Sequence, residues 1–172
     1  MSQREDTNDE DHVDRLREAW ARERPELDTE PIEIVARVGR LAQRLDRELE
    51  RVFAEHGLTR EGFDVLATLR RSGGPYRLSP TELYRTLMRT SGAMTNRLRR
   101  LEDAGLVRRM ADAADRRGLL VELTPEGRRV IDRVAPLHLD NERRLVAGLD
   151  GDERAALAGL LRKLALSLDD AD

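Results

Sequence analysis

The chain has 172 residues, of which 38% are charged and 39% hydrophobic, with a net charge of −3 and no cysteine. The lack of cysteine excludes disulfide bonds, thiol catalysis and cysteine-ligated zinc. No apolar run reaches the roughly 20 residues that cross a bilayer, and the polar start lacks the regions of a signal peptide, so we expect a cytoplasmic protein. The high share of charge favours long amphipathic helices over a β-sandwich.

The N-terminal part is predicted to be an acidic tail followed by two helices. Residues 1–12 lack periodic apolar residues, and we expect them to be disordered. A short helical pattern from His12 to Arg24 carries the single tryptophan, Trp20. Apolar residues at i, i+3, i+4 and i+7 spacing then predict a long helix over 31–56. Residues 13–56 therefore form a predicted N-terminal region, made of an extra helix and a dimerisation helix.

Three further helices are predicted from their start and stop signals. Thr59 can cap the first of them. Ser79 can cap the second, because Glu82 stands where it completes a capping box with the serine. The third begins near Ser91 and ends near Gly105, a suitable residue for a helix C-terminus.

A β-hairpin and two C-terminal helices complete the prediction. Two β-prone runs, 106–110 and 119–123, are joined by a polar connection, which favours a hairpin. Helix, turn, helix and hairpin in this order make residues 57–124 a predicted winged helix-turn-helix. Residues 125–172 are predicted to be dimerisation helices, with Pro136 expected to kink the first. The expected fold class is mainly α with a small β-hairpin.

The predicted helices carry more apolar surface than one small winged domain can cover. The last helix has a continuous stripe of leucines: Leu157, Leu160, Leu161, Leu164 and Leu168. An exposed stripe of that size implies an interface, so we expect a homodimer, with an ordinary intramolecular core as the alternative. A symmetric pair would also hold two recognition helices about one turn of DNA apart.

Charge is distributed unevenly along the chain. Residues 1–30 have a net charge of −6, whereas residues 85–117 have a net charge of +5. A local basic strip in an acidic protein fits a focused polyanion site. The outer face of the predicted recognition helix and the hairpin tip carry polar and basic residues: Ser91, Thr95, Asn96, Arg99, Arg116 and Arg117. Because asparagine can pair with adenine and arginine with guanine or phosphate, double-stranded DNA is the expected partner.

Two stretches carry a resemblance to a known family. They are Ser91-Gly92-Ala93-Met94-Thr95-Asn96-Arg97-Leu98 and Asp115-Arg116-Arg117-Gly118-Leu119-Leu120-Val121-Glu122-Leu123-Thr124. They resemble the recognition helix and the wing pattern, Asp-x-Arg, five residues, Leu-Thr, of MarR family transcription regulators. In order of elements the resemblance covers about 31–168. It implies a dimer with intertwined terminal helices that represses genes through a palindrome. It also implies that Asp115 pairs with an arginine to hold the wing, and that Arg117 enters the minor groove.

The extra N-terminal helix resembles that of the urate-responsive subgroup of this family. The resemblance implies four contacts with a small-molecule effector, urate or a related aromatic anion: Trp20, Asp64, Arg97 and Arg109. A planar purine anion could stack on Trp20 and accept a two-pronged contact from Arg109, while repulsion from Asp64 would shift Arg97 on the recognition helix. Each residue also has a simpler interpretation. Trp20 could anchor the extra helix, Asp64 could stabilise a helix start, and Arg109 could contact phosphate.

The sequence offers less support for other functions than for DNA-binding regulation. We expect no enzyme, cofactor or metal site, because His12, His56 and His138 lack metal-ligand spacing and neither a nucleophile elbow nor a phosphate-binding glycine loop is present. A ligand-independent architectural DNA-binding dimer would share the wing and the helices. A winged helix that binds only proteins would lack salt-dependent DNA binding.

Overall fold

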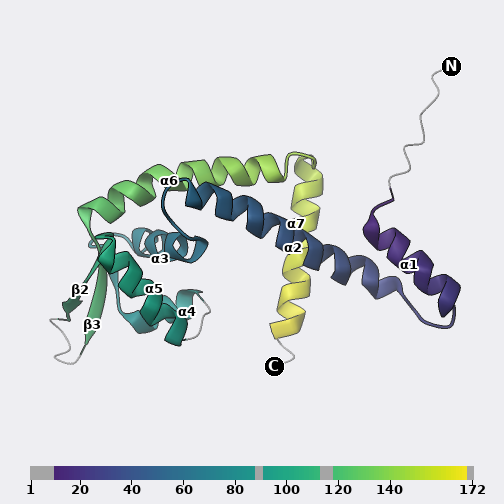
Figure 1. The fold of residues 1–172 in the computed structure, drawn as a ribbon, viewed down its shortest axis with the longest axis horizontal. Coiled ribbons are helices and arrows are strands. Elements are labelled where there is room, and N and C mark those ends of the chain that lie inside the picture. Colours follow the sequence, from purple (N-terminus) through teal and green to yellow (C-terminus); the bar gives the residue numbers. More distant parts are fainter. Residues whose placement is uncertain (1–9, 88–90, 113–117, 170–172) are drawn as a thin grey trace, which may run out of the picture. The chain divides into compact units, whose positions relative to one another are not determined.

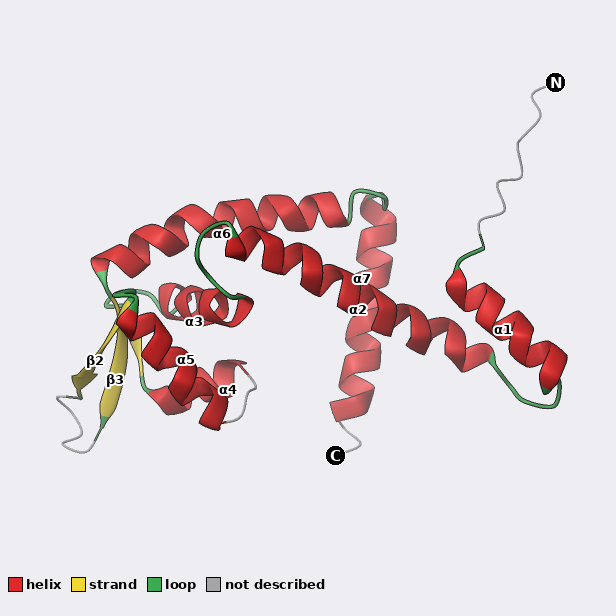
Figure 2. Cartoon of the chain, in the orientation of Figure 1, coloured by secondary structure: helices red, strands yellow, loops and turns green. Residues whose placement is uncertain are grey.

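The computed structural model describes residues 10–87, 91–112 and 118–169, with only the backbone for residues 91–93. The chain divides into two compact units, Met1–Glu48 and Leu49–Asp172. The described residues are mostly helical with one small sheet (Figures 1 and 2), so the predicted fold class is confirmed. Among these residues, none of the helices has the length and apolar character needed to cross a membrane.

The N-terminal unit contains α1 (His12–Glu23) and most of α2 (Glu30–Ala54). Helix α1 begins at His12 because the Asp11 carboxylate accepts hydrogen bonds from the backbone amides of Val13 and Asp14, at 2.6 and 3.2 Å. Such a cap satisfies amides that have no partner inside the helix. Residues 11 and 12 thus belong with the helix and not with the predicted disordered tail, whose residues 1–9 lie outside the described part.

Arg37 on α2 fixes the start of α1. Its guanidinium donates to Asp11 Oδ2 at 2.9 Å and to Asp14 Oδ1 at 2.6 Å. These hydrogen bonds are the main reason why the pKa of Asp11 is lowered from 3.8 to about 2, and they also lower the pKa of Asp14. The contact between α1 and α2 therefore depends on ionised carboxylates.

We expect this contact to weaken in acid. Because the folded-state pKa of Asp11 lies below its ordinary value, its stabilising contribution is complete above about pH 4 and is lost as the pH falls towards 2. The emission of Trp20 on α1 should change across that window. The change should be smaller in Asp11→Asn, and it should be retained in Asp140→Asn, a control on an exposed carboxylate of the C-terminal unit. A wild-type emission profile that is flat below pH 4 would contradict the assignment.

The C-terminal unit contains the end of α2 and eight further elements. They are α3 (Arg60–Arg71), β1 (Arg77–Leu78), α4 (Pro80–Leu87), α5 (Ser91–Asp103), β2 (Val107–Ala111), β3 (Leu119–Leu123), α6 (Pro125–Leu145) and α7 (Gly151–Asp169). Strands β2 and β3 form the predicted hairpin, while the unpredicted β1 pairs with the other edge of β3, giving the antiparallel order β1-β3-β2. Helix α6 includes Pro136 and continues to Leu145.

The core of the C-terminal unit surrounds α3. Leu66 and Leu69 of α3 are fully buried, as are Leu83 of α4 and Met94 of α5. Burial of these side chains on several helices orients α4 and α5 relative to α3, since apolar surface removed from water stabilises only that arrangement. The outer faces of α4 and α5 are consequently set by the core.

Helix α6 begins directly against the turn that follows α5. The hydroxyl of Thr124 donates to the Gly105 carbonyl at 2.7 Å and accepts from the Gly127 amide at 2.9 Å. A Cβ placed on Gly127 would lie 1.9 Å from the Leu106 carbonyl oxygen. Glycine at this position is what allows the two backbones to approach so closely.

Candidate nucleic-acid interface

Helix α4 precedes α5, the predicted recognition helix, and begins with the predicted capping box. The Glu82 amide donates to Ser79 Oγ at 3.2 Å, and the Ser79 amide donates to Glu82 Oε2 at 2.7 Å. Hydrogen bonds donated by Ser79 lower the pKa of Glu82. The bond from the backbone amide has the larger effect, and the bond from the hydroxyl adds to it. The start of α4 is therefore fixed locally, and the buried Leu83 one turn further attaches the helix to the core.

Helix α5 has one buried and one exposed face. Met94, Leu98 and Leu101 are buried in the core. The side chains of Thr95, Asn96 and Arg99 are exposed, as expected for the outer face of a recognition helix. Ser91 is the first residue of α5, but its side chain lies outside the described part. A polar face with an amide and a guanidinium can hydrogen-bond to base edges in a major groove.

The hairpin is attached to the end of α5 by Arg109. Its backbone amide donates to Glu102 Oε1 at 3.2 Å, and its guanidinium Nε lies 3.5 Å from Glu102 Oε2. Within the hairpin, Arg108 pairs with Glu122 at 2.7 Å. The three predicted residues of the wing tip, Asp115, Arg116 and Arg117, lie outside the described residues.

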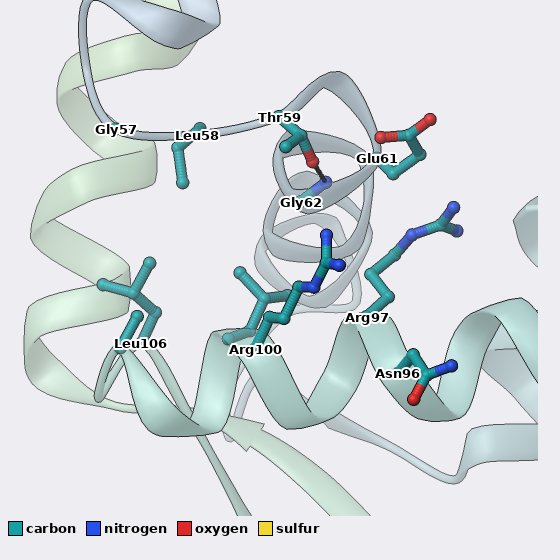
Figure 3. Close-up of a pocket in the computed structure, with 11 residues that line it drawn as sticks. Gly57, Leu58, Thr59, Glu61, Gly62, Asn96, Arg97, Arg100 and Leu106 are labelled. Atoms are coloured by element: carbon teal, nitrogen blue, oxygen red, sulfur yellow. Dashed lines mark hydrogen bonds between the residues drawn. The ribbon is translucent and has the colours of Figure 1, made fainter.

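A pocket of about 330 Å³ lies between α5 and the start of α3 (Figure 3). From α5, Arg97 points towards Glu61, and Arg100 points towards Thr59 and Gly62. Thr59 Oγ1 accepts from the Gly62 amide at 3.1 Å, which caps α3 as predicted. No ion pair joins either arginine to another residue that the structure describes. Two guanidiniums and the Glu61 carboxylate line the pocket, which leaves its lining with an excess of positive charge.

The four predicted effector contacts have different positions. Arg97 is half-buried in the wall of this pocket, whereas Asp64 on α3 and Arg109 on β2 do not line it. Trp20 lies on α1 in the N-terminal unit, with 41% of its surface exposed. Sequence reasoning missed Arg100, although its position three residues after Arg97 places both on one helix face.

Comparison with known proteins identifies the family. A model described as MarR family matches residues 56–118. The HTH-type transcriptional regulator PecS of Dickeya dadantii is 41% identical over 145 residues, covering 84% of this chain and 87% of PecS. The relatives are transcriptional regulators, in agreement with the expectation that the protein is not an enzyme.

Solved structures show the same fold. A mutant of MarR from Escherichia coli in complex with operator DNA matches with a TM-score of 0.71 and 31% identity, covering 79% of this chain and 96% of that one. BpsR of Bordetella bronchiseptica, whose DNA binding is regulated by 6-hydroxynicotinic acid, matches with a TM-score of 0.68 and 28% identity, covering 77% and 98%. The chain belongs to the MarR family of DNA-binding transcriptional regulators.

Proposed function

We propose that the protein represses transcription as a homodimer on a palindromic operator and is released by a small anionic aromatic molecule. DNA binding is supported most directly by the exposed polar face of α5, where Thr95, Asn96 and Arg99 lie opposite the buried face. By resemblance, four further residues join this interface at the helix start and the wing: Ser91, Asp115, Arg116 and Arg117. The α5 contacts would read bases, and the wing arginines would bind phosphates or the minor groove.

The homodimer follows from apolar surface that the single chain leaves exposed. Helix α7 contains no buried residue. It exposes a stripe of five leucines, Leu157, Leu160, Leu161, Leu164 and Leu168, while Leu166 is exposed on the opposite side of the helix. Burying such a stripe against a symmetric copy removes apolar area from water and gives a closed assembly. Two copies of α5 would then match the two halves of a palindrome.

The pocket beside α5 is the proposed site of the effector. Arg97 and Arg100 present two guanidiniums, which suit a planar anion such as urate or an aromatic carboxylate. The regulation of BpsR by 6-hydroxynicotinic acid supports this class of ligand. Urate is the favoured member, and Trp20, Asp64 and Arg109 stay as predicted further contacts.

The same pocket offers a route from effector to DNA. Asn96 lines the pocket and also belongs to the exposed face of α5. An anion bound by Arg97 and Arg100 therefore acts on the helix that carries the base-reading side chains. Release requires that the ligand bind the DNA-incompetent state more tightly, by roughly 5 kcal/mol for a nearly complete shift.

Effector binding by the pocket can be tested with Arg97→Gln/Arg100→Gln. Urate should release the wild-type protein from a labelled fragment of its own promoter region, and the variant should need at least about ten times more urate. Because these arginines lie near the DNA-reading face, urate binding is also titrated without DNA by calorimetry. Arg133→Gln, on the exposed side of α6, is the matched control.

Two outcomes would contradict the effector proposal in different ways. If the double variant binds urate as the wild type does, the pocket is not the effector site. If neither urate nor 6-hydroxynicotinic acid releases the wild type from DNA, the ligand-independent architectural function is favoured instead.

A further inference from the structure

Helix α2 has an arginine-rich face within the N-terminal unit. Arg40, Arg44 and Arg47 are exposed, and at 100° per residue they lie within about 60° of one another around the helix. From residue 34 to residue 45 the helix has arginines but no acid. We call Arg40, Arg44 and Arg47 the α2 arginine face.

The arginine face lacks the neutralising partners that a solvated helix face usually has. Arg37, the preceding arginine, is held by Asp11 and Asp14. By contrast, no ion pair links Arg40, Arg44 or Arg47 to any residue within the described ranges. Exposed arginines of one sign at i, i+4 and i+7 repel each other, so an anion that bridges them removes an unfavourable interaction.

These arginines also line a concavity. A hollow of about 470 Å³ lies between the start of α1 and α2, lined by the capping residue Asp11, by His12 of α1 and by the arginine face of α2. Because Asp11 is already occupied by Arg37, the hollow keeps an excess of positive charge. A concave basic site binds a small anion with more contacts than a flat surface does.

The position of the face leaves it accessible in the proposed dimer. The exposed apolar residues of α2 include Ile34, Val38 and Leu45, which the helical periodicity places roughly 110° to 155° from the mean direction of the arginine face. A partner chain that covers this apolar side would therefore leave the arginines open to solvent.

We propose that the α2 arginine face binds a small polyphosphate, a molecule with two or more adjacent phosphoryl groups. Arg40 and Arg47 are seven residues apart, about 10 Å along the helix axis, so a ligand longer than one carboxylate or phosphate can contact all three guanidiniums without drawing these like charges together. A chain of phosphoryl groups can engage all three guanidiniums, each through a two-pronged contact. This site is separate from the pocket at α5 and does not depend on the identity of the effector there.

The test is calorimetric titration of the full-length protein with inorganic triphosphate. Binding should be saturable, and inorganic phosphate should bind at least about ten times more weakly. Arg40→Gln/Arg44→Gln/Arg47→Gln should reduce triphosphate affinity at least about tenfold. A control with the same loss of charge, Arg133→Gln/Arg162→Gln/Lys163→Gln, should keep the wild-type affinity. Circular dichroism and Trp20 emission check that α1 and α2 stay folded.

A second variant keeps the test decisive if the glutamine variant is unstable. Arg40→Lys/Arg44→Lys/Arg47→Lys retains the charge and should keep part of the affinity. The proposal is wrong if triphosphate does not bind the wild type, or if the glutamine variant and its control lose affinity equally. It is also wrong if the α2 variant changes only the affinity for non-operator DNA, because the face would then be a nucleic-acid contact.

Discussion

Gly127→Ala should destabilise the C-terminal unit by about 3 kcal/mol, a large fraction of the stability of a small domain. The new Cβ would lie 1.9 Å from the Leu106 carbonyl oxygen and 3.2 Å from a methyl carbon of Leu123. The first neighbour is backbone, so it cannot rotate away, and α6 would have to move from the turn after α5. Urea denaturation followed by circular dichroism measures the loss.

Gly159→Ala is the matched control for this prediction. Gly159 lies inside α7 with no atom within 4 Å of an added Cβ, and the helical periodicity places it opposite the leucine stripe. Alanine there should raise helix stability by roughly 0.5–1 kcal/mol. Equal stability of Gly127→Ala and the wild type would mean that α6 does not pack against Leu106 as described.

Asn96→Ala/Arg99→Ala should weaken operator binding at least about a hundredfold, because each base-edge contact contributes roughly 1–3 kcal/mol. Both side chains are exposed, so their truncation leaves the core intact. Fluorescence anisotropy with an operator duplex, without effector, gives the affinity and the number of chains bound. Two chains per palindrome are expected for wild type and variant at saturation.

The pattern of affinity loss among variants distinguishes base recognition from non-specific electrostatic attraction to DNA. Arg133→Ala removes one positive charge from α6 and should leave operator affinity nearly unchanged at physiological salt. The double variant should also discriminate less between the operator and a duplex with altered bases. If it bound the operator as tightly as the wild type, α5 would not be the recognition helix.

Elements determined by neighbouring residues could be predicted from the sequence. Ser79 and Glu82 are three residues apart and form the expected capping box. Thr59 caps α3 in the same manner. The buried and exposed faces of α5 follow from its helical period, so the positions of Asn96 and Arg99 could be inferred without coordinates.

Features that depend on residues distant in sequence could not be predicted. Strand β1 has two residues and no alternating pattern, and it exists because Arg77 and Leu78 pair with Glu122 and Val121 of β3. The pocket lined by Arg97 and Arg100 likewise combines the start of α3 with one face of α5. The spacing of Arg97 and Arg100 places both on one face of α5, but only the packing of α3 against that face makes it the wall of a pocket.

The junction at Thr124 and Gly127 fixes the first turn of α6 against the turn that follows α5. The 21 residues of α6 extend for about 30 Å. Its N-terminal end is joined to the turn that follows α5, the proposed recognition helix. A tilt of about 5° at the far end would displace that helix by nearly 3 Å, close to the 3.4 Å spacing between successive base pairs. In the proposed dimer, small changes in the angle between the two copies of α6 would therefore be enough to shift the two copies of α5 out of register with the base pairs of the operator.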